Sequence, residues 1–354
     1  MGSNPENNSS NNPPIAGAIT YPTCHGQNLQ ATPVQPRQPR NLQGLLRFAM
    51  EATKAEDAPG NSELGPMDEE RRKFLEEALK SLTVDVAEVI QNAIKVLTDQ
   101  EKIRNIQLGD VLPQDVATSF NNLMEFIDDI DVANDFYKLG GFAIFPVCYG
   151  SENEEVRANA SWVLAEVCQN NPFCQSRVLE CGLLNVLINL LETEQGTALA
   201  KCLYAVSCAC REYSPCCREL VSQGGCGALS AVLASQDTFP QARTKAAFLI
   251  RYLVQHYPDA REEFIQQNLV RIVANQIKTG RDETTEHLLG ILTLLLDTND
   301  CRILDQLRDP SLGLKKVLEE LSDHEDGREY CVDLLKRVFE DCPEYEVIND
   351  EVER

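Results

Sequence analysis

A repeat of about 43 residues constrains the fold of this chain more than any other feature of its sequence. Pro172, Pro215 and Pro258 are each 43 residues apart, and each lies ten residues before Gly182, Gly225 or Asn268. Asp131 and Gly141 have the same separation of ten residues. An apolar segment, a polar turn and a longer apolar segment follow each time. Self-similarity at such a period indicates stacked repeats rather than separate globular domains.

The longer apolar segments share one register. Residues 160–167, 202–209, 246–253 and 288–295 align without gaps and carry apolar residues at helical spacing. Their alignment places one residue of each segment at an equivalent position, with separations of 42, 44 and 42: Trp162, Tyr204, Phe248 and Gly290. A unit of this length, with helices and no strand pattern, is typical of armadillo and HEAT repeats.

The backbone preferences of Pro, Gly and Asn explain why these residues recur at the ends of the short helix in each unit. Proline starts a short helix because its missing N–H is unpaired there anyway, and Gly or Asn ends that helix in a left-handed conformation. This helix-ending role accounts for the pairs 140–141 and 224–225 as well. One unit cannot cover its own apolar faces. The sequence therefore predicts an all-α, armadillo-type right-handed solenoid of four repeats with helical caps at both ends and a concave face.

The expected organisation has five parts. The first is a flexible N-terminal arm at 1–65 with a short apolar motif at 40–50, since most of the arm is too polar to form a core. Capping helices are expected within 66–130, where apolar residues recur at 74–82 and 86–97. Four repeats at 131–300, C-terminal capping helices at 301–340 and an acidic tail at 341–354 complete the chain.

Charge and hydropathy exclude several classes of partner. The chain has 32 Lys and Arg against 55 Asp and Glu, a formal net charge of -23, which repels nucleic acid and anionic lipid. No apolar run approaches the roughly 20 residues of a membrane span, and the N-terminus lacks the pattern of a secretory signal. We expect a cytoplasmic protein that binds neither nucleic acid nor membranes.

The 14 cysteines are interpreted mainly as small core residues, since most fall inside helical apolar patterns. The densest group contains no C-x-x-C pair and no neighbouring histidine: Cys202, Cys208, Cys210, Cys216, Cys217 and Cys226. We expect no metal and no cofactor.

Catalytic constellations are not evident. The histidines, His25, His256, His287 and His324, are scattered, and the glycine pairs lack the Lys-Ser/Thr of a phosphate loop. Paired acids such as 128–129 and 154–155 suit solvated turns. The sequence predicts a binding protein rather than an enzyme.

The last helix of each repeat lines the concave face in armadillo folds, and side chains at i, i+3 and i+7 share one side of it. The candidate binding residues on that side are Asn159, Trp162, Glu166, Lys201, Tyr204, Lys245, Phe248, Tyr252, Glu286 and His287. The alternative interpretation, that such apolar stripes belong to the core, applies most to Phe248 and Leu294.

Four segments carry a resemblance to a known family: 40–46 (RNLQGLL), 67–75 (MDEERRKFL), 245–249 (KAAFL) and 286–290 (EHLLG). They resemble the heat-shock-protein-70-binding nucleotide exchange factors. The resemblance implies four armadillo repeats whose concave face holds one lobe of the ATPase domain of a 70-kDa heat-shock chaperone and displaces the other, so that ADP leaves. The partner would carry out the ATP chemistry.

Alternatives remain at this point. A nuclear-import-type armadillo receptor needs repeated Trp and Asn pairs, but only Trp162 is present, with Glu166 in place of Asn. A scaffold without nucleotide exchange activity has the same repeats. A further hypothesis is that Leu42, Leu45 and Leu46 occupy the client site in the chaperone's peptide-binding domain; an idle arm or a helix docked on the rod are its alternatives.

Overall fold

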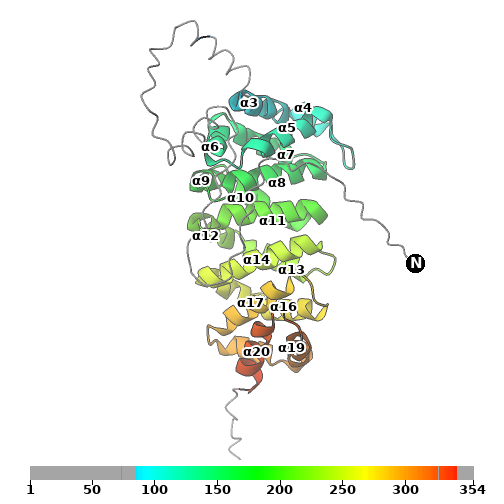
Figure 1. The fold of residues 1–354 in the computed structure, drawn as a ribbon, viewed down its shortest axis with the longest axis vertical. Helices are drawn as coiled ribbons and strands as arrows, with labels where there is room; N and C mark the ends of the chain where they lie inside the picture. The colour runs from blue at the N-terminus through cyan, green and yellow to red at the C-terminus, as the bar shows by residue number, and fades with distance from the viewer. Residues whose placement is uncertain (1–72, 74–84, 326, 341–354) are drawn as a thin grey trace, which may run out of the picture. The chain divides into compact units, whose positions relative to one another are not determined.

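The computed structural model describes residue 73 and residues 85–325 and 327–340, and the regular elements in these residues are helices (Figure 1). The helices from α3 onward belong to one compact unit, Val84–Arg354. The arm motif at 40–50, the acidic tail at 341–354 and the apolar stripe at 74–82 lie outside the described residues.

Units of three helices succeed one another between residues 130 and 296. The first helices of the units are α6 (Ile130–Lys138), α9 (Pro172–Glu180), α12 (Ser214–Ser222) and α15 (Pro258–Gln266). The second helices are α7 (Ile144–Tyr149, after the 3-10 turn η1, Gly141–Ala143), α10 (Leu183–Thr193), α13 (Gly225–Ala234) and α16 (Leu269–Lys278). The third helices are α8 (Glu154–Cys168), α11 (Gly196–Cys210), α14 (Pro240–His256) and α17 (Thr285–Leu296).

Further helices flank these units on both sides. Before them come α3 (Val86–Leu97), α4 (Gln100–Arg104) and α5 (Gln114–Phe126). After them come α18 (Cys301–Leu307), the 3-10 turn η2 (Pro310–Leu312), α19 (Leu314–Ser322), α20 (Arg328–Leu335) and a π-helical turn η3 (Lys336–Glu340). The predicted stripe at 86–97 is thus confirmed as one helix.

The third helices pack side by side in sequence order, α8 on α11, α11 on α14 and α14 on α17, and the flanking helix α20 packs on α17 (Figure 1). Small residues such as Ala160, Ala205 and Ala246 are fully buried on these helices, which lets neighbouring backbones approach. One continuous apolar core results. The stacked three-helix repeats predicted from the 42 to 44 residue spacing are therefore confirmed.

The position of the helix-ending residue was predicted one residue too late in two repeats. The left-handed residues after the first helices are Gly140, Gly182, Gly224 and Asn268, with φ of 84°, 67°, 81° and 59°. Gly141 and Gly225 do not have this role. The spacing misled because α12 begins at Ser214, so Pro215 is its second residue. A proline is tolerated there too, since the second N–H of a helix also lacks an intrahelical partner.

Gly141 and Gly225 are needed for space instead. A Cβ at Gly141 would lie 2.3 Å from the Phe136 ring. At Gly225 it would lie 2.3 Å from Leu220 Cδ1 and 2.7 Å from the Leu220 carbonyl oxygen. Each glycine pair therefore combines a left-handed residue with a position where the second helix starts directly against the first.

Replacing Gly225 by Ala is expected to lower the free energy of unfolding by about 1–3 kcal/mol, since the new methyl group overpacks a backbone oxygen that cannot rotate away. Gly227→Ala is the matched control in the same helix, because its Cβ would have only Gln267 Nε2 nearby, at 3.7 Å. That change should be neutral or stabilise by up to about 1 kcal/mol. Urea unfolding followed by circular dichroism measures both; equal midpoints for the two variants would contradict the steric argument.

The cysteines of the dense group lie in the core, as predicted. Each of the six is at most 2% exposed. Burial raises the pKa of Cys216 and Cys226 to about 12, so these thiols stay protonated at neutral pH. Within the described residues, no three His, Cys, Asp or Glu side chains are grouped as a metal site would require.

Candidate protein-binding face

Alternating aromatic and polar side chains connect the third helices of neighbouring repeats. Lys201 Nζ of α11 lies 4.4 Å from the ring centroid of Trp162 in α8, and Lys245 Nζ of α14 lies 4.6 Å from that of Tyr204 in α11. The His287 ring of α17 meets Phe248 edge-on, with centroids 5.6 Å apart. We call these six residues the aromatic–cation ladder.

The register of the repeats produces the ladder. Lys201, Lys245 and His287 each lie three residues before the equivalent positions Tyr204, Phe248 and Gly290. Because adjacent third helices are packed side by side, the residue three positions earlier in one repeat comes to lie on the aromatic ring of the preceding repeat. Each contact of a cation with a ring contributes about 0.5–1 kcal/mol at exposed sites.

Hydrogen bonds fix the first part of the ladder. Trp162 Nε1 donates to Glu166 Oε1 at 3.1 Å, and Lys201 Nζ donates to Asn159 Oδ1 at 2.9 Å. The hydroxyl of Tyr204 donates to the same Glu166 oxygen at 3.4 Å. Burial lowers the pKa of Lys201 and raises that of Tyr204. The structure thus brings the predicted residues of α8 and α11 into one network.

The exposed fractions of the side chains distinguish between the two interpretations of the apolar stripe, a binding face or a part of the core. Trp162 is 38% exposed and Phe248 is 37% exposed, so neither belongs to the core. Leu294 is half-buried and packs against the core. The ladder therefore presents two large aromatic surfaces to solvent, and such side chains are enriched at protein interfaces.

Two other predicted residues lie apart from the ladder. The Tyr252 hydroxyl accepts a hydrogen bond from the Glu212 backbone N–H at 2.8 Å, so this side chain holds the turn after α11. Glu286 is exposed in the first turn of α17. Leu42, Leu45 and Leu46 lie outside the described residues.

Gly290 interrupts the aromatic series for a steric reason. A Cβ there would lie 2.8 Å from the Arg251 guanidinium carbon. Arg251 reaches from α14 to α20, where its Nη2 donates to the Tyr330 hydroxyl at 2.8 Å and its guanidinium lies 5.6 Å from the Tyr330 ring centroid. The glycine therefore makes room for a contact that continues the ladder to the end of the stack.

A cavity of about 300 Å³ opens within the ladder and is lined by Tyr204, Ser207, Arg211, Thr244, Lys245, Phe248 and His287. Sequence reasoning missed Ser207, Arg211 and Thr244. A signal was available for two of them, because Ser207 and Arg211 follow Tyr204 at i+3 and i+7 and extend the same helix side.

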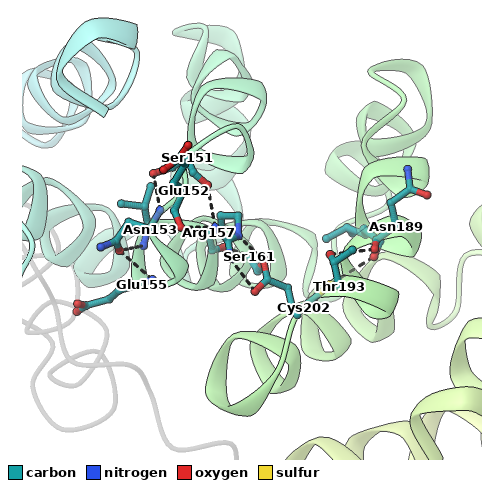
Figure 2. A network of polar contacts seen from close by, with 12 residues as sticks. Ser151, Glu152, Asn153, Glu155, Arg157, Ser161, Asn189, Thr193 and Cys202 are labelled. Carbon is teal, nitrogen blue, oxygen red and sulfur yellow. Dashed lines mark hydrogen bonds and ion pairs between the residues drawn. The ribbon is translucent and has the colours of Figure 1, made fainter. Parts of the chain in front are cut away.

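Polar contacts position α8, the helix that begins the ladder. Asn153 caps α8 by accepting from the N–H groups of Glu155 and Val156, at 3.0 and 3.2 Å (Figure 2). Its Nδ2 donates to the carbonyls of Gln107 and Asp110, at 2.9 and 3.0 Å, so the loop before α5 is fixed to the first repeat.

Arg157 joins the first repeat to the second. It donates to the carbonyls of Ser151 and Glu152, at 2.8 and 2.9 Å (Figure 2). Its Nη2 also donates to Glu194 Oε2 at 3.0 Å, in the turn before α11. The Glu194 side chain is 5% exposed. This pair sets α8 and α11 relative to each other and therefore the spacing between Trp162 and Lys201.

The chemistry of the face is that of recognition. Exposed rings, half-buried cations and an open cavity suit contact with another protein surface. In the part of the chain that the structure describes, no helix is long and apolar enough to cross a membrane.

Comparisons with known proteins support this interpretation. The model of the nucleotide exchange factor Fes1 matches residues 42–136, and the model of the SIL1/FES1/HPBP1 C-terminal domain matches residues 132–240. Hsp70-binding protein 1 of Mus musculus is 27% identical over 317 residues, which cover 86% of this chain and 87% of the relative. The Homo sapiens protein of that name is 28% identical over 316 residues, covering 86% of each chain.

Two further comparisons concern a fungal relative and the fold. The Hsp70 nucleotide exchange factor fes-1 of Neurospora crassa is 29% identical over 131 residues, which cover 36% of this chain and 50% of that protein. A computationally designed armadillo repeat protein superposes with a TM-score of 0.57 at 13% identity, covering 72% of this chain and 99% of the design. The fold is therefore an all-α armadillo-type solenoid.

Proposed function

This chain belongs to the SIL1/FES1/HPBP1 family, and we propose on that premise that it is a nucleotide exchange factor for a 70-kDa heat-shock chaperone. The observation that carries the proposal is the similarity to Hsp70-binding protein 1, which extends over 86% of the chain. The stacked repeats and the ladder lie within residues 130–296. The candidate face that they form is the surface proposed to bind the chaperone.

The proposed mechanism is differential binding. The ladder residues would hold one lobe of the chaperone's ATPase domain, with Trp162 and Phe248 as exposed anchors and Lys201 and Lys245 as charged contacts. A rigid protein that binds the open, ADP-free form of this domain more tightly than the closed form shifts the population towards the open form. ADP then dissociates faster. The protein itself would catalyse no reaction, and ATP hydrolysis would remain with the chaperone.

Release of a fluorescent ADP analogue from the chaperone tests the proposal. The full chain, added in excess at fixed ionic strength, is expected to raise the release rate, because a shift to the open form removes contacts to the nucleotide. Binding without any change in the rate would instead support the scaffold alternative. If the chain neither binds the chaperone nor accelerates ADP release, the proposed function is wrong.

The N-terminal arm is proposed to help release the chaperone's client. Leu42, Leu45 and Leu46 are apolar in a polar region, flanked by Arg40 and Arg47. Each leucine buried in a peptide groove could contribute about 1.5–3 kcal/mol before ordering costs.

Changing Leu42, Leu45 and Leu46 together to Ser is therefore expected to slow the loss of a labelled client peptide from the chaperone, while ADP release stays as in the wild type. The two rates are measured in parallel on the same chaperone preparation. Identical client-release rates for the variant and the wild type would assign the arm no such role.

The cytoplasm is the compartment we propose. The twelve described cysteines are free thiols, and ten of them are buried. Thiols of this kind suit a reducing environment.

A further inference from the structure

Three positively charged or titratable side chains converge on the cavity within the ladder. Arg211, at the end of α11, lies 5.9 Å from the Phe248 ring centroid, and Lys245 lies over Tyr204. His287 completes this side of the cavity. The side chains come from three successive repeats, so their convergence depends on the stacking of α11, α14 and α17.

Within residues 85–325 and 327–340, no carboxylate forms an ion pair with Arg211 or Lys245 of this cavity. The chain carries a net charge of -23, so a surface cation would usually have a carboxylate close by. Among the described residues, neither Arg211 nor Lys245 forms an ion pair; both rest on aromatic rings instead. The neighbouring carboxylate of Glu166 accepts from Trp162 and Tyr204.

Two polar side chains of the cavity lining also have atoms without a hydrogen-bond partner among the described residues. Ser207 lines it without a side-chain hydrogen bond to other described residues. His287 Nδ1 is shielded from solvent and has no hydrogen-bond partner in the part of the chain that the structure describes. Thr244 is less free, because its hydroxyl pairs with Thr284 at 2.9 Å. An arginine fork, an ammonium group and a hydroxyl around one opening match the geometry of a carboxylate.

We propose that this cavity binds an aspartate or glutamate side chain on the surface of the chaperone's ATPase domain. The inference rests on the proposed function, since the partner is the same domain. The carboxylate would receive charge-assisted hydrogen bonds from Arg211 and Lys245, with the exposed Phe248 ring excluding water at the rim. A pair of this kind fixes the register of the two proteins as well as adding affinity.

The test is the salt dependence of binding to the ATPase domain. The double variant Arg211→Gln with Lys245→Gln is expected to bind about tenfold or more weakly at low ionic strength, because two cations that face an acid are removed. Its affinity should also fall less steeply with salt than that of the wild type. The matched control, Lys95→Gln with Lys315→Gln, removes the same charge at exposed positions on α3 and α19 and should bind as the wild type does.

Mapping the contact completes the test. A benzophenone amino acid in place of Phe248 is expected to cross-link to a peptide of the ATPase domain that contains an Asp or Glu. Changing that acid of the chaperone to Lys should weaken its binding to the wild-type chain. The Lys245→Glu variant of the chain should restore part of this binding. A cross-linked peptide without an acid, or inhibition by inorganic phosphate beyond its effect on ionic strength, would overturn the proposal, the latter by assigning the cavity to a free anion.

The outcomes distinguish this inference from the function on which it rests. If the wild type accelerates ADP release while the double variant keeps wild-type affinity and salt slope, the cavity is not a carboxylate site, although the exchange function stands. If the wild type neither binds nor accelerates release, the function itself is wrong. Circular dichroism and urea unfolding confirm that each variant is folded.

Discussion

Arg157→Leu is expected to lower the free energy of unfolding by about 3–5 kcal/mol, because it leaves the Glu194 carboxylate buried without its partner. The side chain of Glu194 is 5% exposed and that of Arg157 is 19% exposed, so water cannot replace the lost contact fully. The carbonyls of Ser151 and Glu152 lose their donor as well. Urea unfolding of the full chain, followed by circular dichroism, measures the change.

Arg243 provides the matched control, since it occupies the same position two repeats later, in α14. It pairs with Asp282 at 3.3 Å, and the Asp282 side chain is 38% exposed. Arg243→Leu should therefore cost less than Arg157→Leu, with a contribution from the ion pair of at most about 1 kcal/mol. Changing both Arg157 and Glu194 to Leu should recover much of the stability lost in the single variant. Equal losses at the two arginines would contradict the assigned role of burial.

Trp162→Ala is expected to weaken binding to the chaperone's ATPase domain about 30-fold, or about 2 kcal/mol, as is usual for an aromatic anchor of an interface. The side chain is 38% exposed, so its removal should change stability much less than a core truncation would. The specific interactions lost among the described residues include the contact with Lys201 and the hydrogen bond to Glu166. Isothermal calorimetry gives the affinity, and thermal unfolding gives the stability.

Leu108→Ala is the control for Trp162, because Leu108 is also a large apolar side chain, 70% exposed, but lies in the loop before α5. Its affinity should stay near that of the wild type. An unchanged affinity for Trp162→Ala would remove this residue from the proposed face, whereas a lower melting temperature with unchanged affinity would make its role structural.

Much of the fold could be predicted from local patterns. The repeat length, the equivalent positions of Trp162, Tyr204 and Phe248, and the capping Asn268 follow from the spacing of residues along the chain. The start of α12 at Ser214 could not be predicted in this way, because a proline is tolerated in both the first and the second position of a helix. The steric role of Gly225 also escaped, because it depends on where Leu220 lies in space.

The candidate residues of the binding face were predicted from the sequence, but the contacts between them were not. Helical spacing placed Lys201 and Tyr204 on one side of their helix, yet it carried no information on which residue of the next repeat would meet them. The stacking offset of the helices decides that Lys245 lies on Tyr204 and that Arg211 reaches Phe248. Tyr252 was assigned to the face because of its helical spacing. The spacing could not predict that its hydroxyl accepts a hydrogen bond from the Glu212 backbone N–H in the turn after α11.

The reach of Arg251 across Gly290 affects how the end of the stack unfolds. In a simple repeat array each unit touches only its neighbours, so the terminal helices can fray one at a time. Here α14 is hydrogen-bonded directly to Tyr330 in α20, past the intervening α17. Loss of α20 therefore removes a contact of α14 as well, and we expect amide hydrogens of α17 and α20 to exchange with solvent in a single cooperative opening rather than in two steps.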